Sequence, residues 1–263
     1  MSPQAVAPPA PAQTPWAGGH NRSAAANELR IAGMVPYSSV DWPGKLALSV
    51  FCQGCPWKCL YCHNHDIIDP RKPGSVPWEK VRSLLSRRAG LLDAIVFSGG
   101  EACLQRALVP AAREAKEMGF LVGLHTCGAY PKRLAELLSA RLVDWVGFDL
   151  KASPAGYPEL VGRVHSWRPV ATSLGALVAS GVAYEVRMTV TPGLVAQVPQ
   201  VLAVAAQAGV TEVVLQQARA DGAPAALREA LRDSPGWDGV FSRAVASARN
   251  DFPALKVHAR PAQ

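Results

Sequence analysis

The chain alternates short, almost wholly apolar runs with longer segments whose apolar residues recur at helical spacing. The apolar runs predict β-strands, because a strand covered on both faces has few polar positions. These predicted strands are residues 46–51, 94–97, 121–124, 145–150, 184–190 and 212–216, with a last short strand at 255–259. The amphipathic segments predict helices at 78–88, 108–117, 131–140, 170–179 and 198–208, followed by a C-terminal helical segment.

This alternation predicts an α/β fold with a parallel sheet built from right-handed βαβ units. Six such units fit an incomplete TIM-like barrel, but periodicity alone does not separate a barrel from a flat, doubly wound sheet. In both architectures the chemistry belongs at the carboxyl ends of the strands.

The two ends of the chain differ from this pattern. Residues 1–27 are rich in Pro and Ala and have no continuous apolar stretch, so we expect a disordered extension rather than a secretory signal. Residues 28–263 then form the core domain, with a C-terminal helical and strand extension. Within it, Pro36, Pro43 and Gly44 predict an irregular lead-in over residues 31–44.

Composition adds little to this fold class. The 263 residues are 49% hydrophobic and 18% charged, with a net charge of +7. The basic residues are scattered and form no aromatic-interleaved stripe, so we expect no nucleic acid partner. No apolar stretch reaches the length of about 18 residues that spans a bilayer, so we expect no membrane association.

The cysteines point to specific chemistry. Four of the six lie in the stretch from Cys52 to Cys62, which predicts a metal site. A structural zinc site usually takes two CxxC pairs about 12–20 residues apart, whereas only Pro56-Trp57-Lys58 separates the two pairs here. The spacing therefore favours an iron–sulfur cluster, with a zinc loop as the alternative. Reduced thiols and the missing export signal predict a cytoplasmic protein.

The sequence motifs around the cysteines resemble those of a known superfamily. Asp41-Trp-Pro-Gly44, Gln53-Gly-Cys55-Pro-Trp-Lys-Cys59 and Tyr61-Cys-His-Asn64 resemble the radical S-adenosylmethionine (SAM) superfamily, and within it the glycyl-radical-enzyme activating enzymes. The similarity runs from Ile31 to Arg219 and is closest to the branch that activates anaerobic ribonucleoside-triphosphate reductase.

The resemblance implies an oxidoreductase with an incomplete (βα)6 radical SAM barrel. Cys55, Cys59 and Cys62 would hold a [4Fe–4S] cluster, which leaves one iron open for SAM. A low-potential donor such as a flavodoxin would supply the electron that cleaves SAM to a 5′-deoxyadenosyl radical. That radical would generate a glycyl radical on a partner enzyme, and no side chain would act as acid or base. Cys52 could be a fourth ligand, but the motif leaves it out.

The resemblance also implies SAM contacts at several strand ends. Taken alone, the two glycines are better explained by an ordinary βα turn. Beside the cysteines, however, Gly99, Gly100 and Glu101 match the motif whose backbone holds the methionine ammonium group. Tyr61 would lie beside the adenine. His63 and Asn64 could tune the cluster or cap a turn.

Asp149 and Lys151 end the fourth of the six strands and could form a structural ion pair or contact SAM through its ribose or carboxylate. Arg187 would grip a carboxylate, and Gln216 would line the adenine side together with Gln217. His125 replaces an acid that helps to hold a monovalent cation in the pyruvate formate-lyase activating relatives. A neutral imidazole is a poor ligand for a hard cation, so the sequence does not decide whether a cation binds here. We expect Cys103 and Cys127 to be buried thiols.

The sequence also allows two other functions. The acceptor could be a small molecule, as in radical SAM deazapurine carboxy-synthases. Alternatively, the chain could be a non-enzymatic zinc-loop protein that binds a partner.

Overall fold

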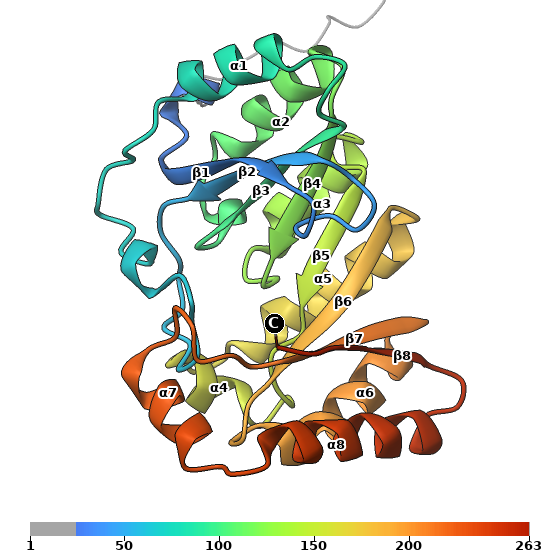
Figure 1. Ribbon diagram of the computed structural model, residues 1–263. Coiled ribbons are helices and arrows are strands. Elements are labelled where there is room, and N and C mark those ends of the chain that lie inside the picture. The colour runs from blue at the N-terminus through green and yellow to red at the C-terminus, as the bar shows by residue number, and fades with distance from the viewer. Residues whose placement is uncertain (1–24, 263) are drawn as a thin grey trace, which may run out of the picture.

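The computed structural model describes residues 25–262 as an α/β domain with one eight-stranded sheet (Figure 1). Neighbouring strands in the sheet follow chain order from β1 to β8. The strands are β1 (Ile31–Ser38), β2 (Ala47–Cys52), β3 (Ala94–Gly99), β4 (Leu121–Thr126), β5 (Trp145–Asp149), β6 (Ala183–Val190), β7 (Glu212–Gln217) and β8 (Lys256–Arg260).

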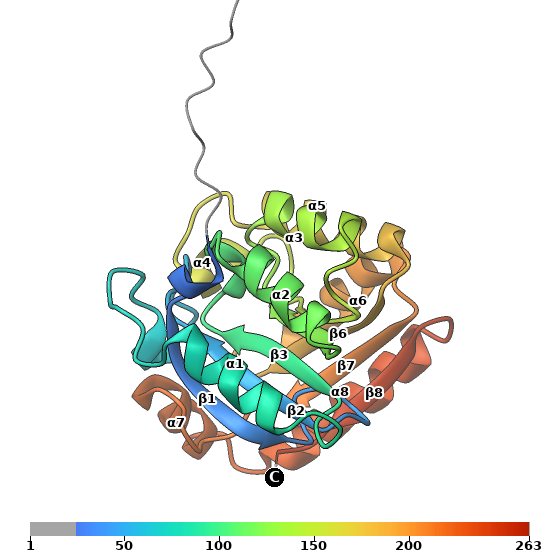
Figure 2. The same cartoon turned by 90° about the horizontal axis from the view of Figure 1, so that it is seen from above.

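The helices cover the outside of the curved sheet (Figure 2). The α-helices are α1 (Trp78–Arg87), α2 (Leu108–Glu117), α3 (Pro131–Ser139), α4 (Tyr157–Val161), α5 (Trp167–Ser180), α6 (Val198–Gln207), α7 (Ala225–Arg232) and α8 (Trp237–Asp251). Short 3-10 helices are η1 (Ala26–Glu28), η2 (His65–Ile67), η3 (Ala102–Leu104) and η4 (Val195–Gln197).

The strands from β2 to β8 are all parallel, and β1 pairs antiparallel with β2. Six βα units run from β2 to β7, which confirms the predicted incomplete barrel. Within residues 25–262, β1 and β8 are the two edges of the sheet and do not pair with each other.

The two faces of the sheet have different roles. On β6, Val186, Met188 and Val190 are fully buried and belong to the main hydrophobic core. Glu185 and Arg187 alternate with them and so lie on the opposite, inner face of the strand. The inner face of β6 therefore carries polar side chains, opposite the apolar face that packs in the main core.

A small second core fills the inside of the barrel. Trp42 stacks on Trp145 with ring centroids 5.5 Å apart, and Ala47, Ala94 and Val96 complete the cluster. Gly123 makes room for it, because a Cβ there would lie 2.8 Å from the ring of Trp42. The Asp41-Trp-Pro-Gly44 segment thus supplies the ring that closes the barrel interior beneath the site.

Three expectations are corrected by the structure. The lead-in over residues 31–44 is irregular only in its second half, since Ile31–Ser38 forms β1. The polar loop expected after residue 150 contains helix α4. The disordered extension was expected over residues 1–27. Residues 1–24 lie outside the described part of the chain, but Ala26 lies in η1 and is buried in the core.

The remaining predicted strands and helices are found within a few residues of their predicted ends. Within the described part of the chain, none of the helices combines the length and the apolar character that a membrane span needs.

Candidate functional site

The loop that carries the three motif cysteines begins where β2 ends. All six cysteines of the described chain are free, and those at positions 55, 59 and 62 are partly exposed. The loop is closed by its own backbone: Gly54 N–H donates to Ile67 C=O at 2.8 Å, and Cys62 N–H donates to Cys59 C=O at 3.1 Å. Three thiols are therefore presented from one curled segment at the carboxyl end of the sheet.

Helix α4 supports this loop from the side. Lys58 N–H donates to Val161 C=O at 3.1 Å, and Trp57 packs edge-on against Tyr157 with centroids 5.9 Å apart. The helix that the sequence did not predict thus holds the cysteine loop in place.

The thiols differ in acidity because their surroundings differ. Burial raises the pKa of Cys59 to about 11, although the nearby Lys151 cation opposes this shift. Burial also raises the pKa of Cys62. A hydrogen bond from Cys127 lowers the pKa of Cys55. Lys151 provides positive charge that favours the thiolate form of all three.

The fourth cysteine of the stretch has a different environment. Cys52 is fully buried at the end of β2, where burial and then the nearby Glu101 raise its pKa to about 12. Cys103 and Cys127 are also buried, as expected. Cys52 therefore packs as a core residue in this structure.

The Gly99–Gly100 turn lies against the start of the cysteine loop. Gly99 has a φ of 101°, and a Cβ there would be 2.5 Å from the backbone nitrogen of Cys52. A Cβ on Gly100 would lie 2.2 Å from the carbonyl oxygen of Gly54. Only glycine permits this close approach. Both glycines are therefore required by the packing of the turn against the start of the cysteine loop.

Glu101 follows the turn, but its carboxylate lies inside the protein. It accepts hydrogen bonds from the backbone N–H groups of Cys103 at 3.0 Å and Cys127 at 2.8 Å, and from Thr126 Oγ1 at 2.9 Å. The side chain thereby ties the end of β3 to the end of β4. Any contact of this motif with SAM would come from its backbone.

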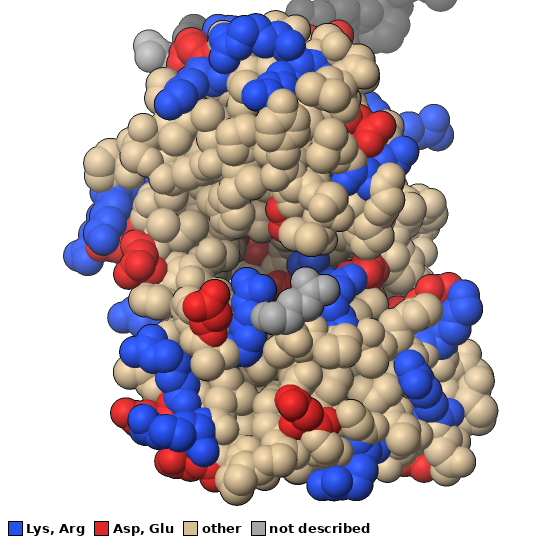
Figure 3. Space-filling model, viewed as in Figure 1, with Lys and Arg blue, Asp and Glu red and all other residues tan. Residues whose placement is uncertain are grey.

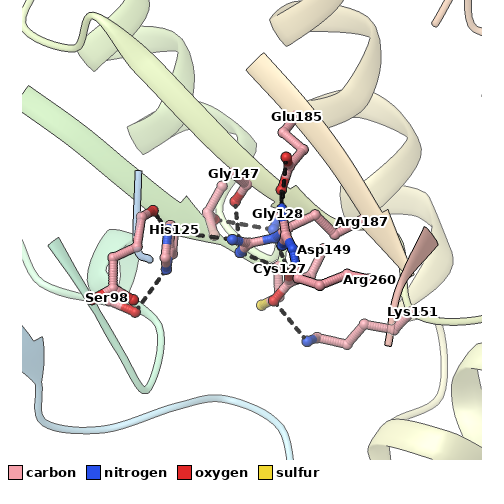
Figure 4. A network of polar contacts seen from close by, with 12 residues as sticks. Ser98, His125, Cys127, Gly128, Gly147, Asp149, Lys151, Glu185, Arg187 and Arg260 are labelled. Carbon is pink, nitrogen blue, oxygen red and sulfur yellow. Dashed lines mark hydrogen bonds and ion pairs between the residues drawn. The ribbon is translucent and has the colours of Figure 1, made fainter. Parts of the chain in front are cut away.

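Asp149, Lys151 and Arg187 form one ionic cluster on the inner face (Figure 4). Asp149 Oδ1 lies 2.9 Å from Arg187 Nη2, and Asp149 Oδ2 lies 3.1 Å from Lys151 Nζ. Burial alone would raise the pKa of Asp149, but the two cations hold it well below its usual range. The two cations together outnumber the carboxylate, so the cluster carries a net positive charge that suits a carboxylate ligand.

His125 adjoins this cluster as a neutral ring. Its Nε2 lies 2.7 Å from the carbonyl of Asp41 and must donate, so Nδ1 accepts from Ser98 Oγ at 3.0 Å. Burial, then the neighbouring Arg187, lower the pKa of His125 to about 4. The guanidinium of Arg187 lies over Gly147, where a Cβ would be 2.8 Å from Nη1.

Tyr61 is buried beside this cluster, with Lys151 Nζ 5.7 Å from the centre of its ring. Its hydroxyl has no hydrogen-bond partner among the residues that the structure describes. A buried hydroxyl without a partner is costly, so it suits a site where a polar ligand completes the contact.

Gln216 is half-buried on β7 and pairs in register with Arg260 of β8. Arg260 Nη2 donates to both carboxylate oxygens of Glu185, at 3.1 and 3.0 Å. Sequence reasoning missed Arg260. The alternation Lys256, His258, Arg260 in the last strand was the available signal, since it places three basic side chains on one face.

These residues fit the cofactors of the resembled family. Three partly exposed thiols lie near a cation, a glycine turn lies beside them, and Tyr61 has a buried hydroxyl without a partner. Within residues 25–262, no three His, Cys, Asp or Glu side chains are grouped as a single metal ion requires. Cys55, Cys59 and Cys62 would hold an iron–sulfur cluster, whose thiolate ligands can come from one loop.

Comparison with known proteins gives the family. The sequence profile of the Radical SAM superfamily matches residues 49–203, more than half of the chain. The chain belongs to the radical SAM superfamily. Among curated relatives, the pyruvate formate-lyase-activating enzyme of Streptococcus mutans is 30% identical over 185 residues, which cover 63% of this radical SAM protein and 68% of the relative.

Two further relatives indicate the branch of the superfamily. A Methanocaldococcus jannaschii protein assigned as a glycyl-radical enzyme activating enzyme is 39% identical over 132 residues, 50% of this chain and 54% of the relative. The Escherichia coli pyruvate formate-lyase 1-activating enzyme is 34% identical over 130 residues, 46% of this chain and 52% of the relative. The chain spans about half the length of these two relatives. It belongs to the glycyl-radical enzyme activating family of radical SAM proteins.

Solved structures agree with the fold. Native anSMEcpe with bound AdoMet superposes with a TM-score of 0.60 at 15% identity, covering 79% of this chain and 61% of the other. QueE from Escherichia coli gives a TM-score of 0.51 at 17% identity, covering 88% of this chain and 93% of the other. These likenesses confirm the incomplete radical SAM barrel.

Proposed function

We propose that this radical SAM protein activates a glycyl-radical enzyme, anaerobic ribonucleoside-triphosphate reductase, with a flavodoxin as electron donor. The observation that carries the proposal is the group of three free thiols on one loop, next to the glycine turn and the Asp149–Lys151–Arg187 cluster. When bound, the cluster and SAM supply the reductive cleavage that yields methionine and a 5′-deoxyadenosyl radical.

The chain's own residues bind and orient in this proposal. Cys55, Cys59 and Cys62 hold the cluster, and the Gly99–Gly100 backbone accepts from the methionine ammonium group. Lys151 and Arg187 lie where positive charge can meet the methionine carboxylate, while Tyr61 offers its ring and free hydroxyl to the nucleoside. Gln216 lies farther along the inner face, on the side proposed for adenine.

The shape of the sheet supports a large acceptor. Within the described residues β1 and β8 leave the barrel unclosed, and Figure 3 shows a hollow between the upper and lower parts of the molecule with charged atoms inside. An open barrel lets a polypeptide segment reach the inner face. The tryptophan pair Trp42–Trp145 fills the interior beneath His125, so entry is from the carboxyl ends of the strands.

The test has two stages. The protein is reconstituted anaerobically with iron and sulfide, reduced, and supplied with SAM, and 5′-deoxyadenosine is measured. It is then incubated with anaerobic ribonucleoside-triphosphate reductase or with pyruvate formate-lyase, and the glycyl radical is recorded by EPR. We expect a radical on the reductase. Deoxyadenosine with a radical only on pyruvate formate-lyase would refute the acceptor, and a zinc protein without SAM cleavage would refute the enzyme.

A further inference from the structure

Asn64 joins the cysteine loop to the glycine turn. Its Nδ2 donates to the carbonyl of Gly99 at 2.7 Å, across 35 positions of the chain. The N–H of Gly100 donates to the carbonyl of Cys52 at 2.9 Å. The Gly99 carbonyl and the Gly100 N–H belong to the same planar peptide group. That peptide plane is therefore held at both of its polar ends.

The next peptide group is fixed as a consequence. Glu101 N–H donates to the carbonyl of Gly54 at 2.9 Å. Because the peptide is trans, the Gly100 carbonyl of that group points away from Gly54. None of the residues in 25–262 donates a hydrogen bond to this carbonyl. The turn thus presents one free acceptor in a fixed direction.

Asn64 is the side-chain component of this arrangement. The other two hydrogen bonds between the loop and the turn come from backbone groups and stay with any substitution. The neighbouring histidines reach elsewhere: His63 Nδ1 lies 3.1 Å from the carbonyl of Asp221, and His65 Nδ1 lies 3.1 Å from that of Cys62. A change at position 64 therefore removes the contact with Gly99 selectively.

We propose that Asn64 is a positioning residue for SAM. Its amide fixes the Gly99–Gly100 peptide, and this orients the free Gly100 carbonyl toward the methionine ammonium group. An ammonium group has three donors, so a preoriented carbonyl contributes to its recognition. This inference rests on the proposed function and adds to it the side chain that sets the geometry of the glycine turn.

The test uses two variants that keep the size of the side chain and lose its N–H donor, Asn64→Leu and Asn64→Asp. His65→Ala is the matched control, because it removes a hydrogen bond within the same loop without reaching Gly99. Each protein is reconstituted anaerobically, and iron, sulfide and the Kd for SAM are measured. We expect equal iron content and SAM binding about tenfold weaker in both Asn64 variants, with the control unchanged.

A second measurement does not depend on catalysis. Hydrogen exchange of the metal-free protein reports whether the Gly100 amide opens more often when Asn64 is replaced. We expect faster exchange at residues 99–101 in Asn64→Leu and wild-type exchange there in His65→Ala.

The outcomes separate this inference from the proposed function. If wild type binds SAM and the variants bind it within twofold, with unchanged exchange at Gly100, the positioning role is wrong and the function stands. Loss of iron in the variants would also overturn the role, because the defect would then lie in the cysteine loop. If wild type itself binds no SAM, the proposed function fails and the role fails with it.

Discussion

The ring of His125 lies between Ser98 and the carbonyl of Asp41, with Arg187 alongside. Burial and the arginine lower its pKa to about 4, whereas an unfolded chain has a histidine pKa near 6.5. Between these values the unfolded state binds more protons than the folded state. The free energy of unfolding must therefore fall as the pH drops through this window.

We predict that this residue contributes about 2 kcal/mol to the loss of stability between pH 7 and pH 5. In His125→Gln the amide can still donate to the Asp41 carbonyl but does not titrate. Its free energy of unfolding, measured by urea denaturation at both pH values, should fall less than that of wild type. Equal losses in the two proteins would show that His125 is not the group that titrates.

The cysteines give a second prediction about single residues. Cys59→Ala should lower the iron content and abolish deoxyadenosine formation, because two thiolates do not hold the cluster. Cys52→Ala should keep both, since Cys52 is fully buried in the core. Iron analysis and product quantification decide this pair. Loss of iron in Cys52→Ala would make Cys52 a ligand.

The sequence indicated candidate residues of the site but not their contacts. Spacing predicted a metal site between Cys52 and Cys62, and the family resemblance selected Cys55, Cys59 and Cys62, which the structure places on one loop. It could not show that the Glu101 carboxylate turns inward to Thr126, nor that Asn64 meets Gly99. Those contacts join segments that are 25 and 35 positions apart in the chain, and only the folded structure brings them together.

Among the elements, β1 shows that proline and glycine can wrongly suggest irregular structure. Pro36 suggested irregular structure, but β1 is an edge strand, where a missing N–H is tolerated. The pairing with β2 has an irregularity between Val35 and Ser38, and Pro36 lies within it. The sequence cannot show that residues 31–38 form a strand, because this depends on their hydrogen bonds with β2.

Strand β5 has a glycine whose replacement we expect to be harmful. In Gly147→Ala the new methyl group would lie 2.8 Å from Arg187 Nη1 and 2.9 Å from His125 Cδ2. Arg187 is held by Asp149, so it cannot move aside without loss. We predict a loss of about 1–3 kcal/mol in the free energy of unfolding, measured by chemical denaturation.

Gly175 in α5 is the matched control for Gly147. No atom lies within 4 Å of a Cβ built there, and its φ lies outside the left-handed region. Gly175→Ala should therefore stabilise the protein by about 0.4–1 kcal/mol. If both substitutions have the same effect, the close approach of Arg187 to β5 is not what requires glycine at 147.

At the scale of the whole molecule, the sequence left the curvature of the sheet undecided. Helix and strand periods are the same in a flat sheet and in a barrel. The decision comes from packing inside the curve, where Trp42 stacks on Trp145 and Gly123 leaves room for the ring. Such contacts depend on residues far apart in the chain, so they become visible only in the folded structure.

The charge of the whole molecule bears on electron delivery. The chain has a net charge of +7, and Lys and Arg side chains gather over α1 in Figure 3. A positive surface attracts an acidic protein donor over distances comparable to the Debye length, about 10 Å at 0.1 M salt. A small chemical reductant reaches the cluster without such guidance. The two kinds of donor should therefore respond differently to salt.

We predict that SAM cleavage driven by reduced flavodoxin slows by about tenfold between 50 and 500 mM salt. Cleavage driven by a small, uncharged reductant should change by less than about twofold, because it needs no long-range attraction. Initial rates of deoxyadenosine formation measure both. Equal salt responses would mean that the basic surface does not guide the donor. Salt would then change a step that both reactions share, at the cofactor site itself.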